Sequence, residues 1–399
     1  MVDYDFLSVY FYSVPNLRFS YKGDWSKRKL NEICHFFKGN GLSKSDLSNE
    51  GFPCILYGEL YTTYKNEVIS DIISKTNTTL SNPFLSRNND LIIPGSGEDP
   101  IDIAVARAIY QNDIILGGDL NILRPKSNVS AAFLSYQLNG VRRYDIAKKA
   151  QGKSIVHLHN SDLKEVLVSI PSCDEQLHIV KLLTKIDEMI ETQSKIIEEY
   201  VILKNSLIHR FFTMDNPKVK LSTILTEINI KNKNKQIDTV LSVSNKLGFI
   251  KQSEQFEDRE VASDDTSNYK IVNKGDYAYN PARINVGSIA RLINYDKGII
   301  SPMYSCFKIN EKKITYTYFD MFLSSFSFKR QLNKKLEGSV RQCLTFEGML
   351  SMDIELPCIE TQKSISNKID MLNYKIKLES DYREALIKQK QFLLNNMFI

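Results

Sequence analysis

The sequence has little of what metal sites and nucleotide-binding loops require. Its six cysteines stand at positions 34, 54, 173, 306, 343 and 358, form no C-x-x-C pair and have no histidine at metal-ligand spacing. A zinc site is therefore not expected. The segment from Pro94 to Pro100, PGSGEDP, has two glycines of a phosphate-binding loop but lacks the G-K-[ST] that would hold a nucleotide. We expect this chain to bind neither a metal ion nor ATP.

Catalytic motifs are also missing. The segment from Asn280 to Arg283, NPAR, begins like the N-P-P-Y motif of adenine methyltransferases, but it lacks the second proline and the aromatic residue that would clamp a flipped base. No glycine-rich loop for S-adenosylmethionine accompanies it. His157 and His159 alternate on a strand-like run, where packing or capping is favoured over catalysis. No Ser/His/Asp or paired-carboxylate arrangement can be assembled, so we expect a protein that is not an enzyme and has no cofactor of its own.

Long apolar runs are absent, and no stretch approaches the roughly 18 uninterrupted apolar residues of a membrane-spanning helix. The first residues, MVDYDFLSVYFYSVP, are acidic where a signal peptide would be basic. Scattered cysteines suit a reducing compartment. We therefore expect a cytoplasmic protein without membrane contact. The 399 residues leave room for two or three domains, and the formal net charge of +5 permits nucleic-acid binding without demonstrating it.

The most informative feature is a stretch that the chain contains twice. Residues 170–212 and 356–398 align without a gap at a spacing of 186 residues, so that Pro171 corresponds to Pro357 and Gln176 to Gln362. No further proline or glycine follows within either copy, so each copy predicts one helix of about 60 Å at about 1.5 Å per residue. Such an internal duplication outranks any local motif in indicating the architecture.

Alternate steps of four and three residues along each predicted helix give a mainly apolar seam. Polar residues interrupt both seams at matching places, Gln193 with Glu379 and Lys204 with Lys390, and such interruptions can fix register at some cost in stability. We expect the two helices to pack on each other as a spacer, antiparallel or parallel, and a closed ring would need them antiparallel. The apolar seam residues are Ile179, Leu183, Ile186, Ile190, Ile197, Leu207, Ile365, Ile369, Leu372, Ile376, Leu386 and Leu393.

Each predicted helix follows a segment of short strand-like runs broken by turn residues, and the second segment repeats the first with diverged sequence. The fold class expected is α+β, with two α/β domains separated by two long antiparallel helices as an internal pseudo-twofold repeat. The expected boundaries are an N-terminal arm at 1–24, a first domain at 25–172, a central helix at 173–215, a second domain at 216–358 and a distal helix at 359–399. Because the helices are alike and the domains differ, we expect the domains to recognise two different things.

This order of domain, helix, domain and helix resembles the specificity subunits of type I DNA restriction-modification enzymes, and the resemblance covers nearly the whole chain. The first helix opens with a segment similar to the P-x-x-x-E-Q-x-x-I motif of that family, from Pro171 to Ile179. The second copy departs from the motif, with Thr361 where the glutamate would stand. Three further segments are also similar to recurring segments of that family. They are VPNLRF with Trp25 near the N-terminus, GELY in the first domain and KGDYAYN in the second.

The resemblance implies a protein without catalysis of its own. Each target recognition domain would read one half of a split double-stranded DNA sequence, and the helices would fix the gap between the halves. The implied partners are two methyltransferase subunits and two ATP-driven restriction subunits, which would use S-adenosylmethionine, ATP and Mg. A different hypothesis also fits the sequence, namely a scaffold or decoy that binds methyltransferase subunits through the helices without reading DNA.

Cations that face phosphates should provide DNA affinity, and polar side chains that face base edges should provide specificity. Two basic clusters predict phosphate clamps, although such charge runs are commonly solvated helix faces. Arg107 and Arg291 lie in apolar runs and fit either a groove-facing role or a structural ion pair, and polar loops with Glu98 and Asn245 are further candidates for base contacts. The candidate DNA-binding residues are Lys38, Lys44, Thr62, Lys65, Ser96, Arg107, Arg142, Arg143, Lys148, Lys149 and Lys153 in the first domain and Lys246, Asn280, Arg283, Arg291, Lys329, Arg330, Lys334, Lys335 and Arg341 in the second.

Overall fold

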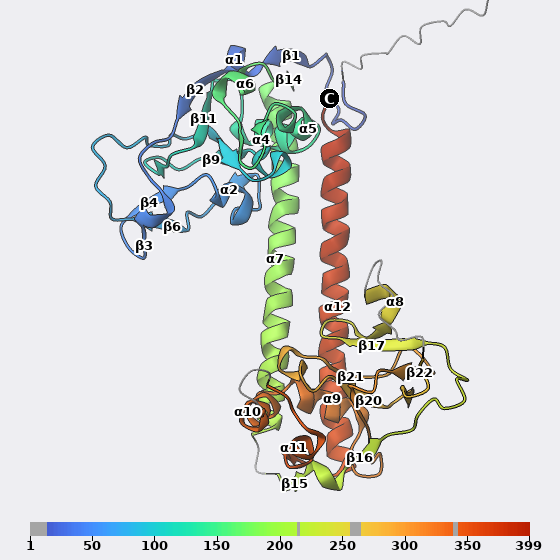
Figure 1. Ribbon diagram of the computed structural model, residues 1–399. Coiled ribbons are helices and arrows are strands. Elements are labelled where there is room, and N and C mark those ends of the chain that lie inside the picture. The colour runs from blue at the N-terminus through green and yellow to red at the C-terminus, as the bar shows by residue number, and fades with distance from the viewer. Residues whose placement is uncertain (1–13, 214–215, 256–264, 338–341) are drawn as a thin grey trace, which may run out of the picture. The chain divides into compact units, whose positions relative to one another are not determined.

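The computed structural model describes residues 14–213, 216–255, 265–337 and 342–399. It divides into two compact units, the first formed by residues 1–195 with 380–399 and the second by residues 196–379. Each unit holds one globule and one end of each of two long helices, α7 (Cys173–Phe211) and α12 (Ile359–Asn396) (Figure 1). The predicted fold class, a repeated mixture of helix and sheet with two long helices, is confirmed.

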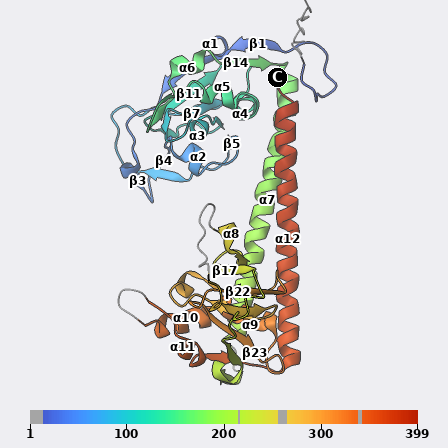
Figure 2. The ribbon, with the colours of Figure 1, turned by 45° about the vertical axis from the view of Figure 1, so that its right-hand side comes forward.

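Both long helices follow a proline and continue because no proline or glycine interrupts them. In the first unit Ile179 of α7 shares a buried core with Met397 of α12, and in the second unit Ile208 of α7 shares one with Ile365 of α12. Within each unit the helix segments are therefore antiparallel (Figure 2). Of the predicted seam residues, Ile179, Leu183, Ile186, Ile365, Ile369, Leu386 and Leu393 are buried, and Ile190, Ile197, Leu207, Leu372 and Ile376 are half-buried.

The described residues of the first globule form four small sheets and several short helices. The largest sheet has the order β2 (Cys34–Lys38), β11 (Leu120–Pro125), β7 (Asp90–Pro94), β9 (Arg107–Ile109) and β5 (Val68–Ile69). The others are β10 (Ile115–Leu116), β4 (Phe52–Ile55), β6 (Ser74–Thr76) and β3 (Leu47–Ser48); β12 (Gln151–Gly152), β13 (Val156–His157) and β8 (Ser96–Gly97); and β1 (Ser26–Lys29) with β14 (Leu167–Ile170). The helices are α1 (Leu30–Ile33), η1 (Lys44–Asp46), α2 (Glu59–Thr62), α3 (Pro100–Ile103), α4 (Ala131–Asn139), α5 (Arg143–Ala147) and α6 (Asn160–Lys164).

The second globule repeats this plan in the part of the chain that the structure describes. Its sheets are β16 (Leu225–Ile228), β23 (Ser305–Ile309), β20 (Tyr277–Tyr279) and β21 (Ile289–Arg291); β18 (Gly248–Lys251), β17 (Val240–Ser244), β22 (Lys297–Ile300) and β19 (Lys270–Asn273); and β15 (Lys218–Lys220) with β24 (Asp353–Glu355). The helices are η2 (Leu221–Thr223), α8 (Gln252–Gln255), η3 (Ile284–Val286), α9 (Tyr316–Ser324), α10 (Phe326–Lys335) and α11 (Phe346–Leu350). The antiparallel order β16-β23-β20-β21 corresponds to β2-β11-β7-β9, and the parallel pair β17-β22 corresponds to β4-β10.

The central strands β7 and β20 are buried on both faces, which explains their nearly continuous apolar sequences. Along β7, Leu91 and Ile93 contact one core cluster while Ile92 contacts another. Along β20, Tyr277 and Tyr279 contact one cluster and Ala278 the other. Successive side chains of a strand point to opposite faces, so each central strand joins two cores.

The same hydrogen-bonded anchor fastens each long helix to its globule. The buried amide of Gln176 donates to the carbonyls of Pro171 and Asn128, each at 3.1 Å, and accepts from the backbone N–H of Ser130 at 2.9 Å. Gln362, 186 residues later, repeats all three bonds with the backbone of Pro357, Lys313 and Thr315, each at 2.9 Å. Ser130 and Thr315 are the N-cap residues of α4 and α9. Each of these two glutamine amides therefore connects the start of a long helix to the residue before it and to the N-terminal end of a shorter helix, α4 in the first globule and α9 in the second.

Glu175, the motif residue that the second copy lacks, binds the N-terminal arm. Its carboxylate accepts from Arg18 Nε at 2.6 Å and Nη2 at 2.7 Å, and from Trp25 Nε1 at 3.2 Å. The backbone N–H of Leu17 donates to the carbonyl of Asn396 at 2.8 Å, so the arm also contacts the end of α12. The second globule follows α7 along the chain and has no separate arm, which gives a physical reason for Thr361 at the corresponding position.

Candidate nucleic-acid interface

Helix α10 presents one apolar face and one cationic face. Phe328 and Leu332 are buried, and the Oγ of Ser325 caps the helix by accepting from the backbone N–H of Phe328 at 3.1 Å. Gln331 exchanges two bonds of 2.8 Å with the backbone of Asp353, which fixes the rotation of the helix about its axis. The exposed cations are Lys329, Arg330 and Lys334, which lie outside the apolar stripe, and Lys335 at the C-terminal end of the helix. None of the four has an ion-pair partner among the described residues, and an unopposed cationic face of this kind suits a row of phosphates.

In the basic cluster of the first globule, the two arginines have internal partners. Arg142 pairs with Asp145 at 3.1 Å and donates to the carbonyl of Ile399 at 3.1 Å, while Arg143 donates twice to the carbonyl of Ile101. Both arginines therefore donate hydrogen bonds inside the first unit. The cations of this cluster that remain for a ligand are Lys148 and Lys153, which are exposed, and Lys149, which is half-buried.

Lys153 lies on the tight connection between β12 and β13. Gly152 precedes it with a φ of +135°, and a Cβ at this position would lie 2.0 Å from the carbonyl oxygen of Ile155. Glycine is therefore required to bring the loop this close to itself. The corresponding Gly338 and the predicted candidate Arg341 lie outside the described residues.

Arg107 and Arg291 occupy structural positions. Arg107 is 6% exposed, its Nε donates to the carbonyl of Leu60 at 3.2 Å, and burial lowers its pKa. The Nη2 of Arg291 lies 2.9 Å from Asp320 Oδ2, and its guanidinium lies 4.8 Å from the centre of the Tyr316 ring. Of the two interpretations that the sequence left open, these internal contacts agree with a structural role, and for Arg291 the contact is an ion pair.

The other candidates of the first globule are dispersed. Lys38 ends β2, Lys44 begins η1, and Lys65 follows α2; all three are exposed, as is Thr62. Lys44 and Thr62 line a pocket of about 590 Å³ together with residues of the GELY segment. Ser96 is only 5% exposed, and its Oγ lies 3.0 Å from Nδ1 of His157. The structure therefore brings Lys44 and Thr62 together and places Ser96 against the neighbouring strand.

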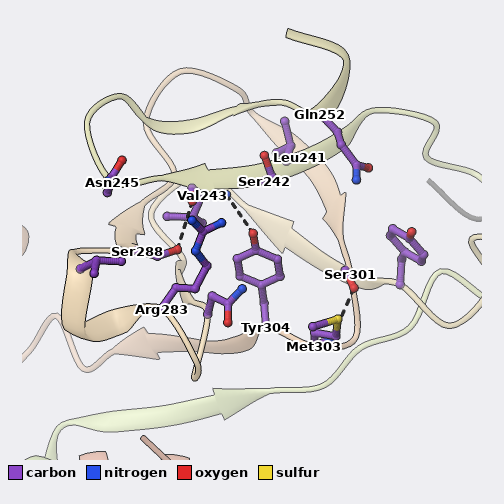
Figure 3. A pocket seen from close by; sticks show the side chains of 13 residues that line it. Leu241, Ser242, Val243, Asn245, Gln252, Arg283, Ser288, Ser301, Met303 and Tyr304 are labelled. Carbon is purple, nitrogen blue, oxygen red and sulfur yellow. Dashed lines mark hydrogen bonds between the residues drawn. The ribbon is translucent and has the colours of Figure 1, made fainter. Parts of the chain in front are cut away.

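In the second globule the structure brings Asn245, Asn280 and Arg283 to one pocket of about 330 Å³ (Figure 3). Lys246 is exposed beside Asn245 but does not line the pocket. The wall of the pocket includes Tyr304, whose hydroxyl accepts from the backbone N–H of Val243 at 3.4 Å. The other lining residues are Leu241, Ser242, Val243, Gln252, Tyr269, Val286, Ser288, Ser301 and Met303.

The aromatic residues in the wall of this pocket were not predicted from the sequence. Tyr304 precedes β23 and Tyr269 precedes β19, and strands separated by many residues in the chain bring both side chains beside Asn280. No local spacing marks them, because the sequence alone does not give the order of strands in a sheet.

Across the described residues, no group of His, Cys, Asp and Glu side chains is arranged to hold a metal ion. The described helices include none with the length and apolar character needed to cross a membrane. The two pockets and the two cationic groups described above offer cations, amides and hydroxyls to a ligand.

Comparisons with known proteins agree with the repeated architecture. Residues 22–199 match the family model described as the type I restriction modification DNA specificity domain. The type I restriction enzyme MjaVIII specificity subunit of Methanocaldococcus jannaschii is 21% identical, over 93% of this chain and 91% of that protein.

Two solved structures share the fold. The S subunit of a type I restriction-modification system from M. genitalium has a TM-score of 0.59 at 16% identity, covering 97% of this chain and 99% of its own. A chain from a study of complex assembly and conformational transition of the type I R-M system has a TM-score of 0.58 at 14% identity, covering 93% and 96%. Residues 22–199 of this chain therefore match the DNA specificity domain of type I restriction-modification enzymes, and the chain is similar over nearly its full length to specificity subunits of these enzymes, which are non-catalytic DNA-recognition components.

Proposed function

We propose that this chain reads a bipartite DNA sequence, with one half of the sequence bound by each globule. The observation that supports the proposal is a contrast within the repeat. The anchor of Gln176 recurs bond for bond at Gln362, whereas the surfaces of the two globules differ in the position and kind of their free polar groups. Two domains that recognise different half-sequences need the same attachment to the long helices and different surfaces toward DNA.

The recognition domains proposed are residues 25–172 and 216–358, preceded by an arm at 1–24 and connected by helices at 173–215 and 359–399. The helices hold two methyltransferase subunits, which supply S-adenosylmethionine, and two restriction subunits, which use ATP and Mg. The complex acts on double-stranded DNA in the cytoplasm. The fold that this chain shares with a chain from a study of type I R-M complex assembly supports a role in such a complex.

Phosphate contacts are assigned to the free cations of the two clusters. In the second globule these are the four exposed cations of α10, and in the first globule they are Lys148, Lys149 and Lys153. The exposed Lys38, Lys44, Lys65 and Lys246 are further positions at which phosphate or sugar oxygens can be bound. Cations of this kind give affinity that falls as salt rises, because each neutralised phosphate releases condensed counterions.

Neutralising α10 tests whether the protein binds DNA through this surface. We expect that changing Lys329, Arg330, Lys334 and Lys335 to Gln lowers the slope of log affinity against log salt by roughly three to four, at about 0.9 per lost phosphate contact. The measurement is fluorescence anisotropy of labelled DNA with the assembled methyltransferase complex over a salt series.

The matched control keeps the charge and changes the side chains, with the three lysines replaced by Arg and Arg330 by Lys. It should bind DNA with an unchanged salt slope. An unchanged slope in the Gln variant would remove α10 from the interface. If the wild-type complex itself showed no salt-dependent DNA binding, the protein would instead be a scaffold that does not read DNA.

A further inference from the structure

We propose that Arg283 reads the major-groove edge of a guanine in the half-sequence bound by the second globule. This inference rests on the proposed function, since it assigns one base to one side chain of a reading head. Three observations support it. The turn fixes the backbone of Arg283, its guanidinium has no partner among the described residues, and the described residues that line the pocket include no carboxylate.

The turn between β20 and β21 holds the backbone of Arg283 from both sides. The N–H of Arg283 donates to the carbonyl of Asn280 at 3.0 Å, and its carbonyl accepts from the N–H of Ser288 at 3.1 Å. Ile284, the next residue, is 2% exposed and anchors the turn in the core. Gly287 takes a φ of +94°, which lets the chain return into β21. A reading residue needs such a fixed backbone, because base discrimination depends on placing donors to within a fraction of an ångström.

The guanidinium of Arg283 is exposed and has no hydrogen-bond or ion-pair partner among the residues that the structure describes. It extends from the turn towards β17, beside Tyr304 (Figure 3). This differs from Arg291, which is held by Asp320, and from Arg124 in the first globule, whose Nε and Nη2 each lie 2.8 Å from Asp90. A free guanidinium retains five N–H donors in one plane.

The surroundings of Arg283 favour a ligand edge that offers acceptors. The Oδ1 of Asn280 accepts from the N–H of Ala282 at 3.1 Å, and the side-chain NH2 group of Asn280 supplies two further donors beside Arg283. No Asp or Glu is among the described residues that line the pocket. Guanine presents two acceptors, O6 and N7, to the major groove, and a bidentate arginine matches them. Adenine would place an amino donor against the guanidinium, so guanine is the base that this site selects.

The corresponding connection in the first globule has the opposite charge. Between β7 and β9 it contains Glu98, Asp99 and Asp102, with Asp99 Oδ1 accepting from the N–H of Ile101 at 2.7 Å as the cap of α3. The connection has no arginine. The assignment of a guanine to this turn therefore applies to the second half-sequence alone.

The test uses the Arg283→Ala variant in complex with its methyltransferase subunit, with methylated adenines mapped across host DNA. We expect one G·C pair of the second half to become degenerate, while the first half and the gap stay unchanged. On DNA duplexes, the preference for guanine at that position should fall roughly 10-fold to 100-fold, the range of one bidentate base contact. Lys334→Ala is the control, and it should weaken all sequences alike and leave the recognised sequence unchanged.

The outcomes separate this inference from the function on which it rests. If the wild-type complex methylates a split sequence and Arg283→Ala leaves that sequence unchanged, the assignment of guanine fails and the function stands. Equal weakening of all sequences by Arg283→Ala would make Arg283 a phosphate contact and would also overturn the assignment. If the wild-type complex specifies no split sequence, the proposed function itself fails. Because Arg283 is exposed, thermal unfolding of the variant should match the wild type.

Discussion

Replacing Lys390 by Met is expected to lower the free energy of unfolding by about 3–5 kcal/mol. The Nζ of Lys390 in α12 lies 2.6 Å from Asp187 Oδ1 in α7 and 2.5 Å from Glu67 Oε2 in the first globule. Both carboxylates are nearly inaccessible, with 5% and 7% of their side chains exposed. Methionine fills similar space but removes the cation, so two buried negative charges would face each other. Urea unfolding of the purified chain measures the loss.

The repeat provides a matched control in Lys204, which occupies the corresponding position in α7. Its Nζ contacts the amide oxygen of Asn373 at 3.2 Å, and this contact is exposed. Lys204→Met should therefore cost less than about 1 kcal/mol. Equal losses in the two variants would contradict the account of the buried network. A triple variant that combines Lys390→Met with Asp187→Asn and Glu67→Gln should recover part of the loss, because it removes the unpaired charges.

The pKa values in this network agree with its role. Burial alone would lower the pKa of Lys390, but the charges of Glu67 and Asp187 raise it above its ordinary value. Burial raises the pKa of Asp187. A lysine whose pKa is raised by folding contributes its full stability below its unfolded pKa and loses it only as pH rises through the folded value. The contribution of Lys390 is therefore fully present at neutral pH.

Replacing Gln176 or Gln362 by Leu is expected to cost about 3 kcal/mol in each case. Each amide makes three hydrogen bonds to backbone groups at a buried junction, and leucine would leave two carbonyls and one N–H there without that partner. The two variants should be destabilised by similar amounts, because the two networks are alike. Urea unfolding with fluorescence detection measures both.

Gln391→Leu is the control for this pair. Gln391 is exposed on α12 and donates to the side chain of Asn395 four residues later at 3.1 Å, so its loss should change stability by less than about 0.5 kcal/mol. A large loss for Gln176→Leu with none for Gln362→Leu would show that the anchors are not energetically equivalent. The interpretation of the repeat as two equal attachments would then be wrong.

The sequence predicted the parts of the molecule that repeat. A gapless offset of 186 residues matched Gln176 to Gln362 and Lys204 to Lys390, and uninterrupted helical sequence predicted α7 and α12. The same pattern could not show that Lys390 is buried between Asp187 and Glu67, because Glu67 lies 323 residues away in the chain. Helical periodicity reports which residues share a face, and it carries no information about the globule that covers that face.

The candidate interface was predicted less completely. A count of charges grouped Arg142 and Arg143 with Lys148, but both arginines are used by Asp145 and by the carbonyls of Ile101 and Ile399. Charge patterns in a sequence cannot distinguish a cation that has an internal partner from one that is free. The cations of α10 were grouped by the same count, and Lys329, Arg330, Lys334 and Lys335 have no internal ion-pair partner among the described residues.

The most direct test of the central claim is to express this chain together with the methyltransferase subunit from its own genome and to map methylated adenines across the host DNA. The account predicts a split sequence with a constant gap, which appears only when both proteins are present. A chimera with a foreign first globule should change one half of that sequence and keep the other. A stable complex that methylates no new sequence, or a chimera that changes both halves, would contradict the account.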